Sequence, residues 1–466
     1  MTQTQQTMFN PLTKYPVGSL REMTTLSIPL MLSALSGALM MFFDRFILAH
    51  YSISAMNAAV TASMSVLVFQ ILVIGVASIA EVYVGQHYGA KEYNKVASPV
   101  WQMIWFSLAC SLILIPIAQL VPEAFIPERF HTEGAPYFKI LLSFSALVGM
   151  NAALCAFFIG QGKVKLITYV VIFGNIINII ADIILIFGVS SWLEPMGTKG
   201  AAIATIISQL FQCCILFFVF LNKANRSRFN THIIKFDFYY FWQCFKIGFP
   251  NALGHMIEFA AWSIQLHLLS MASVYHITVA TIGQSIFGLV AFTTEGLQKA
   301  IIAIASNLIG AKHYAPIKRV FRSAFSLHLI IALLIVTPLA LHPEWFLNDF
   351  LTAEKDPYMI QMVFTYAKVA AYWIFLYFIF DGIVWICAGF LTAHKDTVFI
   401  LCANAFNAWF FALLPTYWFI VVKHNTPDKA WAMIVIYGFV NMLCFGWRLH
   451  SKLKQNVIHS PKETLS

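Results

Sequence analysis

Twelve apolar stretches, each long enough to cross a lipid bilayer as a helix, constrain this chain more than any other feature of its sequence. About 20 apolar residues are needed to cover the hydrocarbon core. The stretches are residues 25–49, 56–83, 99–121, 139–161, 166–188, 199–221, 246–270, 277–301, 320–341, 361–391, 397–421 and 430–449. The composition agrees, since 60% of the residues are hydrophobic, 11% are charged and the mean hydropathy is +0.76. The sequence therefore predicts an all-α integral membrane protein with twelve transmembrane helices.

The basic residues predict the orientation of these helices. With the N-terminus inside, and residues near the ends of spans counted with the adjacent segment, 20 of the 29 lysines and arginines fall on the cytoplasmic side, six fall on the outer side and three lie deeper within spans. This asymmetry is the one that the positive-inside rule describes. The outer loop 342–360 instead carries four acids, which are Glu344, Asp349, Glu354 and Asp356. We therefore expect a cytoplasmic N-terminal tail at 1–23 and a cytoplasmic C-terminal tail at 451–466.

The chain also repeats itself. The segment "GAKEYNKV" at 89–96 returns as "GAKHYAPI" at 310–317, an offset of 221 residues that also places Pro29 on Pro250. Further on, Cys155, Lys163 and Asn175 match Cys387, Lys395 and Asn407 at an offset of 232. We predict two parallel six-helix lobes, 24–222 and 246–450, related by pseudo-two-fold symmetry and joined by a cytoplasmic linker at 223–245. Parallel repeats of this kind are typical of secondary transporters.

Other classes of protein fit the sequence less well. A net charge of +9 does not indicate a nucleic-acid partner, because the basic residues lie in short loops between apolar stretches. The eight cysteines form no CxxC pair, so neither a zinc site nor a disulfide framework is indicated. An intramembrane enzyme is a further alternative, but the chain contains no HExxH motif, and "HMIE" at 255–258 is not a metalloprotease motif. We expect that the protein is not an enzyme and has no catalytic residue.

Acidic residues inside the first and fifth spans predict an ion site. Asp44, within "MMFFDRFILAH" at 40–50, and Asp182 lie at similar depth near the outer ends of their spans, and Asn178 shares a helix face with Asp182. Buried charges usually face a cavity or a partner, and oxygen ligands suit a hard cation. The alternative is that each acid only hydrogen-bonds a neighbouring helix. Arg45 does not face Asp44, so we expect it to pair with an acid on another span or to reach the interface.

A second pair of acids lies in the other half, with Glu258 in the seventh span and Asp381 in the tenth. The repeat places them on Gly37 and Gly149, so neither acid is an inherited duplicate. Such a difference between the halves is typical of function added to a shared scaffold, although a purely structural role is again the alternative. His255, three residues before Glu258, is a candidate for tuning that acid. Glu295 and Lys299, four residues apart, predict a local ion pair.

Several segments, in this order, resemble the multidrug and toxic compound extrusion (MATE) transporters. They are "VGQHYGAKEYNKV" (84–96), "GNIINIIADIILIFG" (174–188), "MGTKGAAIATIISQ" (196–209), "KIGFPNALGHMIEF" (246–259) and "FDGIVWICAGFLTAHKDT" (380–397). The resemblance covers about residues 25–450. It implies a secondary active antiporter that exports small organic, often cationic, compounds by alternating access. The alternative within the same superfamily is a lipid-linked saccharide flippase, although the buried charges here are mainly acidic.

The resemblance also implies roles for individual residues. Asp44, Asn178 and Asp182 align with the amino-terminal cation site of the family, and Glu258 and Asp381 with carboxylates of its carboxy-terminal cavity. The coupling ion is Na⁺ or H⁺, with Na⁺ held at one of these two sets, and no cofactor is implied. Arg45, Ala49 and Ser52 depart from the family pattern at the outer end of the first span. We further expect a monomer that contacts only membrane lipids and drug-like substrates, in the bacterial inner membrane.

Overall fold

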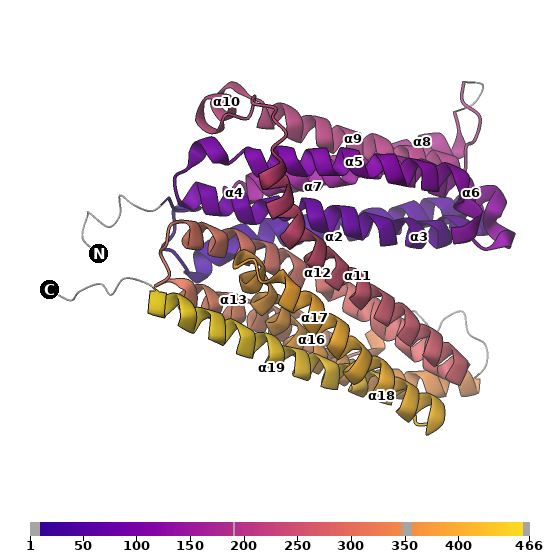
Figure 1. Cartoon of the computed structure of the whole chain (residues 1–466). Coiled ribbons are helices and arrows are strands. Elements are labelled where there is room, and N and C mark those ends of the chain that lie inside the picture. The colour runs from indigo at the N-terminus through magenta and orange to yellow at the C-terminus, as the bar shows by residue number, and fades with distance from the viewer. Residues whose placement is uncertain (1–9, 190–191, 346, 348–356, 460–466) are drawn as a thin grey trace. The chain divides into compact units, whose positions relative to one another are not determined.

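The computed structural model describes residues 10–189, 192–345, 347 and 357–459. Long helices make up nearly all of this part of the chain (Figure 1). The ends of the two predicted tails, 1–9 and 460–466, lie outside the described residues. So do three of the four acids that the sequence places in the outer loop, Asp349, Glu354 and Asp356.

Helices of the first half fall where its six spans are predicted. They are α2 (Leu20–Tyr51), α3 (Ile53–Ala77), α4 (Ala80–Gly89), α5 (Ser98–Leu120), α6 (His131–Ser143), α7 (Ser145–Ile159), α8 (Val164–Phe187) and α9 (Thr198–Phe220), followed by the short α10 (Lys223–Phe229). The second span comprises α3 and α4. The fourth comprises α6 and α7, which meet at a bend of 41° beside Phe144.

The second half follows the same plan. Its helices are α11 (Phe238–Ala272), α12 (Val274–Gly310), α13 (Ile317–Ile331), α14 (Thr337–Leu341), α16 (Pro357–Ala393), α17 (Thr397–Asn407), α18 (Leu414–Thr416) and α19 (Asp428–His459). Three π-helical segments join or extend these helices, at Ala332–Val336, Ala408–Leu413 and Tyr417–Val422. The predicted ion pair is confirmed, because Lys299 Nζ lies 2.6 Å from Glu295 Oε1 on α12.

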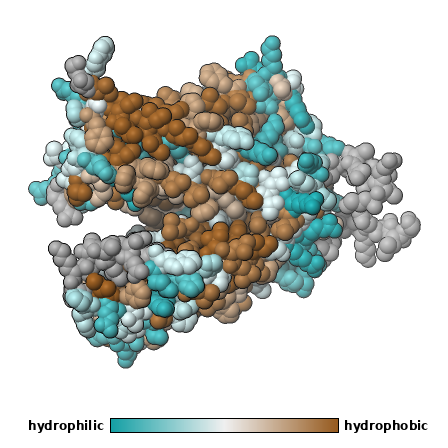
Figure 2. Space-filling model, turned by 180° about the vertical axis from the view of Figure 1, so that it is seen from behind, coloured by the Kyte–Doolittle hydropathy of each residue, from teal (hydrophilic) through white to brown (hydrophobic). Residues whose placement is uncertain are grey.

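Within the described residues, ten helices are long and apolar enough to cross a membrane, and the bent pair α6 and α7 makes an eleventh span. The twelfth predicted span is α11, which has 35 residues. Its apolar run is interrupted by Asn251, His255 and Glu258, and it is not among these eleven spans. Large apolar side chains point outward along the spans, such as Leu112 (80% exposed) and Phe218 (72%), as Figure 2 shows for one face. Lipid is the solvent that suits such a surface.

The chain divides into two compact units. The first contains Ile28–Ala252 and Ile302–His313 together with residues 10–14, and the second contains Tyr15–Ser27, Leu253–Ile301 and the described part of Tyr314–Ser466. Helices α2, α11 and α12 each contribute residues to both units. The lobes 24–222 and 246–450 and the linker 223–245 expected from the sequence stay predictions.

Within the first unit, the ends of α4 and α12 cross in a way that reproduces the sequence repeat. A Cβ atom on Gly89 would overlap the backbone oxygen of Asn307, and one on Gly310 would overlap the backbone oxygen of Gln86. Both glycines and both contacted residues are related by the offset of 221. The turns that follow match as well, because Lys91 and Lys312 both have positive φ, at 58° and 55°. The repeated "GAK" segments are therefore repeated structures.

The structure corrects the later offset by one residue. The turn before α8 places positive φ on Gly162, and the turn before α17 places it on Lys395, which is 233 residues later. A Cβ atom on Gly149 would press on Ser107, and one on Gly382, also 233 residues later, would press on His328. The structural counterpart of Asp381 is therefore Val148 and not Gly149. The conclusion that the first half has no acid there is unchanged.

Candidate ion and substrate site

A polar seam joins α2 to α8 in the first unit. Thr168 Oγ1 donates to the backbone oxygen of Pro29 at 2.7 Å, and Asn175 Nδ2 donates to Ser36 Oγ at 2.7 Å. Seven residues are about two helical turns, so Thr168, Asn175 and Asp182 lie on one face of α8. Asp182 therefore continues the polar face of α8, and Asp44, eight residues after Ser36, continues that of α2.

Asp44 and Asp182 meet at the end of this seam. Their carboxyl groups lie within hydrogen-bonding reach of each other, so that one proton can be shared between them. Asp182 and Asn178 have no exposed surface. Apart from the Asp44 carboxyl group, nothing among the described residues hydrogen-bonds the carboxylate oxygens of Asp182 or the amide atoms of Asn178. Because a buried polar group without a partner is costly, this arrangement favours a proton or a cation between the acids.

Arg45 lies next to Asp44 in the chain but is not its ion-pair partner. Its side chain is exposed, and it forms no salt bridge within the part of the chain that the structure describes. The structure thus brings together Asp44, Asp182 and Asn178 and leaves Arg45 outside. Tyr137 on α6, which is 6% exposed, also lies close enough to both acids to sense their charge. The role of these residues as a cation site stays a prediction.

Donors surround Glu258 in the second unit. Tyr437 on α19 donates its hydroxyl to Glu258 Oε1 at 3.4 Å, and Asn404 on α17 donates its amide to Glu258 Oε2 at 3.4 Å. His255 Nδ1 lies 3.8 Å from Glu258 Oε2, one turn away on the same helix. The predicted neighbourhood of His255 and Glu258 is therefore observed, although the tuning itself is untested.

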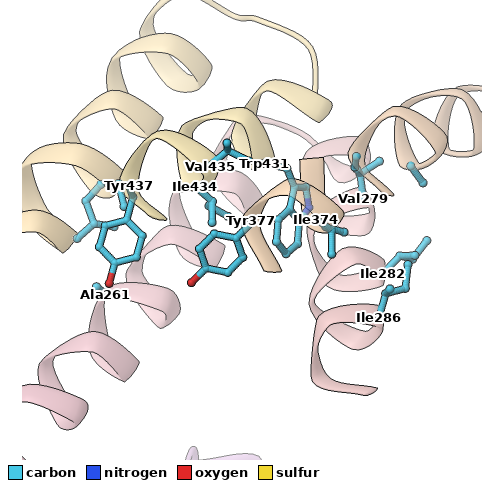
Figure 3. Close-up of a cluster of buried hydrophobic side chains, with 14 of the residues drawn as sticks. Ala261, Val279, Ile282, Ile286, Ile374, Tyr377, Trp431, Ile434, Val435 and Tyr437 are labelled. Carbon is cyan, nitrogen blue, oxygen red and sulfur yellow. The ribbon is translucent and has the colours of Figure 1, made fainter. Parts of the chain in front are cut away.

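Asp381 belongs to the same group of side chains. It is 6% exposed and accepts a hydrogen bond from the Tyr377 hydroxyl at 3.3 Å, while its Oδ2 has no partner among the described residues. Glu258 and Asp381 lie near each other and near both tyrosines. In Figure 3 the hydroxyls of Tyr377 and Tyr437 point to the same side of the apolar cluster that holds their rings. Each of the two carboxylates thus has a tyrosine hydroxyl as a donor, and the Asn404 amide is a second donor at Glu258.

A small hollow adjoins Glu258. Trp262, Gln265, Ala408 and Tyr437 line it with Glu258, and Gln265 Nε2 is fixed by a 3.1 Å hydrogen bond to Thr416 Oγ1. A second hollow beside it is lined by Trp262, Gln265 and Trp431. Indole and phenol rings next to a carboxylate are the surroundings that an organic cation prefers. No three His, Cys, Asp or Glu side chains among the described residues converge as they would around a transition metal.

Sequence reasoning missed Tyr377, Tyr437 and Asn404. Tyr377 was within reach of such reasoning, because it lies four residues before Asp381 and so shares its helix face. Tyr437 and Asn404 lie on other helices, at sequence separations of 179 and 146 residues from Glu258. No pattern within either helix points to Glu258, so only the packing of α11, α17 and α19 reveals these donors.

A duplicated helical membrane protein with acids inside its spans has the design of a secondary transporter. The family comparison is more specific, because the MatE family model matches residues 29–184 and 250–418. The chain therefore belongs to the MATE family of multidrug and toxic compound extrusion proteins, whose members are transporters and not enzymes. The matched ranges begin at the two repeated prolines, Pro29 and Pro250, and so follow the internal repeat.

The names of similar proteins agree with this family. The chain is 24% identical over 359 residues to "Probable multidrug resistance protein NorM" of Thermotoga maritima, with 76% of each chain covered. It is also 24% identical over 298 residues to "Probable multidrug resistance protein YoeA" of Bacillus subtilis, covering 61% of this chain and 63% of that protein.

Solved structures share the fold. An outward-facing multidrug resistance MATE family transporter of the MOP superfamily superposes with a TM-score of 0.85 at 15% identity, over 98% of this chain and 99% of that one. A MOP superfamily transporter from Pyrococcus furiosus, described as having a binding pocket of reversed polarity, gives a TM-score of 0.84 at 15% identity over the same shares. The predicted fold class is confirmed as the twelve-helix, two-lobe fold of these transporters.

Proposed function

We propose that this protein exports small organic, often cationic, compounds across a cell membrane in exchange for Na⁺ or H⁺. The observation that carries the proposal is the Asp44–Asp182 pair, in which Asp182 is fully buried beside Asn178 and has no N–H or hydroxyl donor among the described residues. Such a pair can bind a proton or a cation while the site is open to one side of the membrane and release it while the site is open to the other side. That is the property that a coupling site needs.

Competition for these acids explains how the ion drives export. A bound Na⁺ or H⁺ neutralises the acids and removes their attraction for a cationic compound, so that loading the ion releases the cargo. Inward movement of one charge gains about 2.3 kcal/mol per 100 mV of membrane potential, which is enough to bias the cycle. The second acid group is suited to the cargo as well, because Glu258 lies beside the rings of Trp262 and Tyr437.

The names of the relatives support drug-like substrates, because both are probable multidrug resistance proteins. The alternative of a saccharide flippase gains no support from the site, since its buried charges are carboxylates. We further propose that both termini are cytoplasmic, that the membrane is the bacterial inner membrane and that the protein acts as a monomer. The excess of basic residues in the segments assigned to the inside supports this orientation.

The test is transport by the purified protein in liposomes, with a pH gradient and a sodium gradient imposed separately. Efflux of a fluorescent organic cation should follow one of the two gradients. Asp44→Asn and Glu258→Gln should each reduce ion-driven efflux, and Tyr417→Phe, at an exposed tyrosine, serves as the control. The proposal is wrong if both acid variants transport as the parent does, or if neither gradient drives the cation.

A further inference from the structure

The segment between the two repeats carries a surface that the transport site does not use. We propose that residues 223–242 form an interface anchor, which binds anionic phospholipid headgroups at the end of the first unit. The anchor is defined by its exposed basic residues and its exposed apolar residues. These are Lys223, Arg226 and Lys235, and Ile233, Ile234, Phe236, Phe238, Tyr239 and Trp242.

The depth of the anchor is set by two buried side chains of α5. Trp101 Nε1 donates to the backbone oxygen of Thr231 at 3.0 Å. Gln102 donates to the backbone oxygen of Lys235 at 2.9 Å and accepts from the backbone N–H of Asp237 at 3.0 Å. Both side chains belong to the first turns of α5, where the apolar span begins. The segment is therefore held at the level where the hydrocarbon core ends, in the stretch between α10 and α11 in Figure 1.

The apolar side chains of the anchor are held outward at this level. Ile233, Ile234 and Phe236 are 52–58% exposed, although the backbone on either side of them is fixed by Trp101 and Gln102. The first turns of α11 add Phe238, Tyr239 and Trp242, which are 67%, 69% and 51% exposed. Aromatic residues gather at the headgroup level of membrane proteins because one part of the ring is apolar and the other polar. Lipid is thus the occupant that this surface fits.

The charges specify which lipid. All four basic residues Lys223, Arg226, Arg228 and Lys235 are exposed, but Arg228 lies 4.7 Å from the centre of the Tyr93 ring and is engaged there. The single acid of the segment, Asp237, is also engaged, because its Oδ1 accepts from the backbone N–H groups of Tyr239 and Tyr240 at 3.0 and 3.2 Å. Three uncommitted basic groups beside an apolar row at the bilayer edge attract anionic headgroups rather than zwitterionic ones.

Trypsin cleavage of the unmodified protein tests the proposal. The full chain is placed in nanodiscs of phosphatidylcholine alone, or of phosphatidylcholine mixed with phosphatidylglycerol, and cleavage after Lys235 is timed. Cleavage should be several-fold slower in the anionic discs, while cleavage after the exposed Lys454 should keep its rate. Equal rates after Lys235 in the two kinds of disc would overturn the proposal, as would equal slowing at both sites.

Variants give a second measurement. We expect the triple variant Lys223→Gln, Arg226→Gln and Lys235→Gln to retain several-fold less phosphatidylglycerol per protein after purification from mixed lipid. A matched triple variant, Lys165→Gln with Lys318→Gln and Arg322→Gln, removes three exposed basic residues elsewhere and should retain the parent's amount. Equal lipid in all three proteins would contradict the proposal. Because neither measurement requires transport, their failure would leave the proposed antiport standing.

Discussion

Asp44 and Asp182 face each other in the first unit without a hydrogen-bond donor for Asp182, whereas Glu258 and Asp381 in the second unit each accept a hydroxyl hydrogen bond from a tyrosine. Donors stabilise a carboxylate that keeps its charge, and a bare pair requires a proton or a cation. The duplicated halves thus have similar backbones, but the polar side chains around the acids of the first unit differ from those around the acids of the second unit.

The largest expected effect tests whether the bare pair works as one site. Asp182→Asn should reduce ion-driven efflux to the background of empty vesicles, because the remaining carboxyl can no longer share a proton or a cation with its partner. The double variant Asp44→Asn with Asp182→Asn should be no worse than the single one, since residues that act as a unit are not additive. The measurement is efflux of a fluorescent cation from liposomes. A double variant with clearly lower activity than a still active single variant would show two independent acids.

The shared scaffold should respond equally in both repeats. Gly89→Ala and Gly310→Ala each place a methyl group against a backbone oxygen of the other helix, so each should lower the free energy of unfolding by about 1–3 kcal/mol or more. Thermal unfolding in detergent measures the loss. Gly446→Ala is the matched control, because nothing lies within 4 Å of a Cβ atom at that position. A large loss of stability in only one of the variants Gly89→Ala and Gly310→Ala would contradict the structural equivalence of the two repeats.

A smaller effect should separate the two acid groups. Tyr437→Phe removes a 3.4 Å hydrogen bond to Glu258. If Glu258 binds the coupling ion, the half-saturating ion concentration should fall roughly threefold to tenfold, the range expected for one net hydrogen bond, because a carboxylate that loses a donor binds a proton or a cation more tightly. Tyr417→Phe, at an exposed tyrosine, should have no effect. An unchanged ion dependence in Tyr437→Phe would show that the donor shell in the second unit does not serve the ion.

The smallest effect concerns the turn between α4 and α5, outside the spans. Glu92 Oε2 lies 2.8 Å from His87 Nδ1, and Glu92 Oε1 lies 3.1 Å from Lys95 Nζ. The hydrogen bond with His87 has the largest effect and the one with Lys95 the next largest, and together they lower the pKa of Glu92 from its ordinary value of 4.5. The stabilisation is therefore present above pH 4.5 and is lost as the pH falls through the lowered pKa. Glu92 is 42% exposed, so Glu92→Gln should cost below about 1 kcal/mol near neutral pH.

Unfolding temperatures of the parent and Glu92→Gln, measured against pH, check this prediction. The difference between the two proteins should vanish in acid. A difference that persists well below pH 4.5 would show that the glutamine disturbs packing and not charge. The corresponding position in the second repeat is His313, so this ion pair is another feature that only one repeat carries.

The positions of the spans could be predicted from the sequence, because the energetic cost of an unpaired backbone group in lipid requires long apolar helices. The repeat of "GAK" at 89–91 and 310–312 could also be predicted, since Gly89 and Gly310 are needed where two backbones approach closely. The later offset was misread by one residue. An alignment by residue identity matches Lys163 with Lys395. An alignment by backbone conformation instead matches Gly162 with Lys395, because these are the residues with positive φ in the two turns. Equivalence there depends on backbone conformation, which residue identity does not report.

By itself the sequence determined that this protein is a twelve-span duplicated membrane protein, and that Asp44, Asp182, Glu258 and Asp381 lie within its spans. These features depend on residue type and on distance along a helix. Only the tertiary structure decided that Asp44 meets Asp182 while Arg45 stays exposed, and that Tyr437 and Asn404 bond to Glu258. The physical reason is that the rotation of a helix and the choice of its neighbours are fixed by packing between segments far apart in the chain.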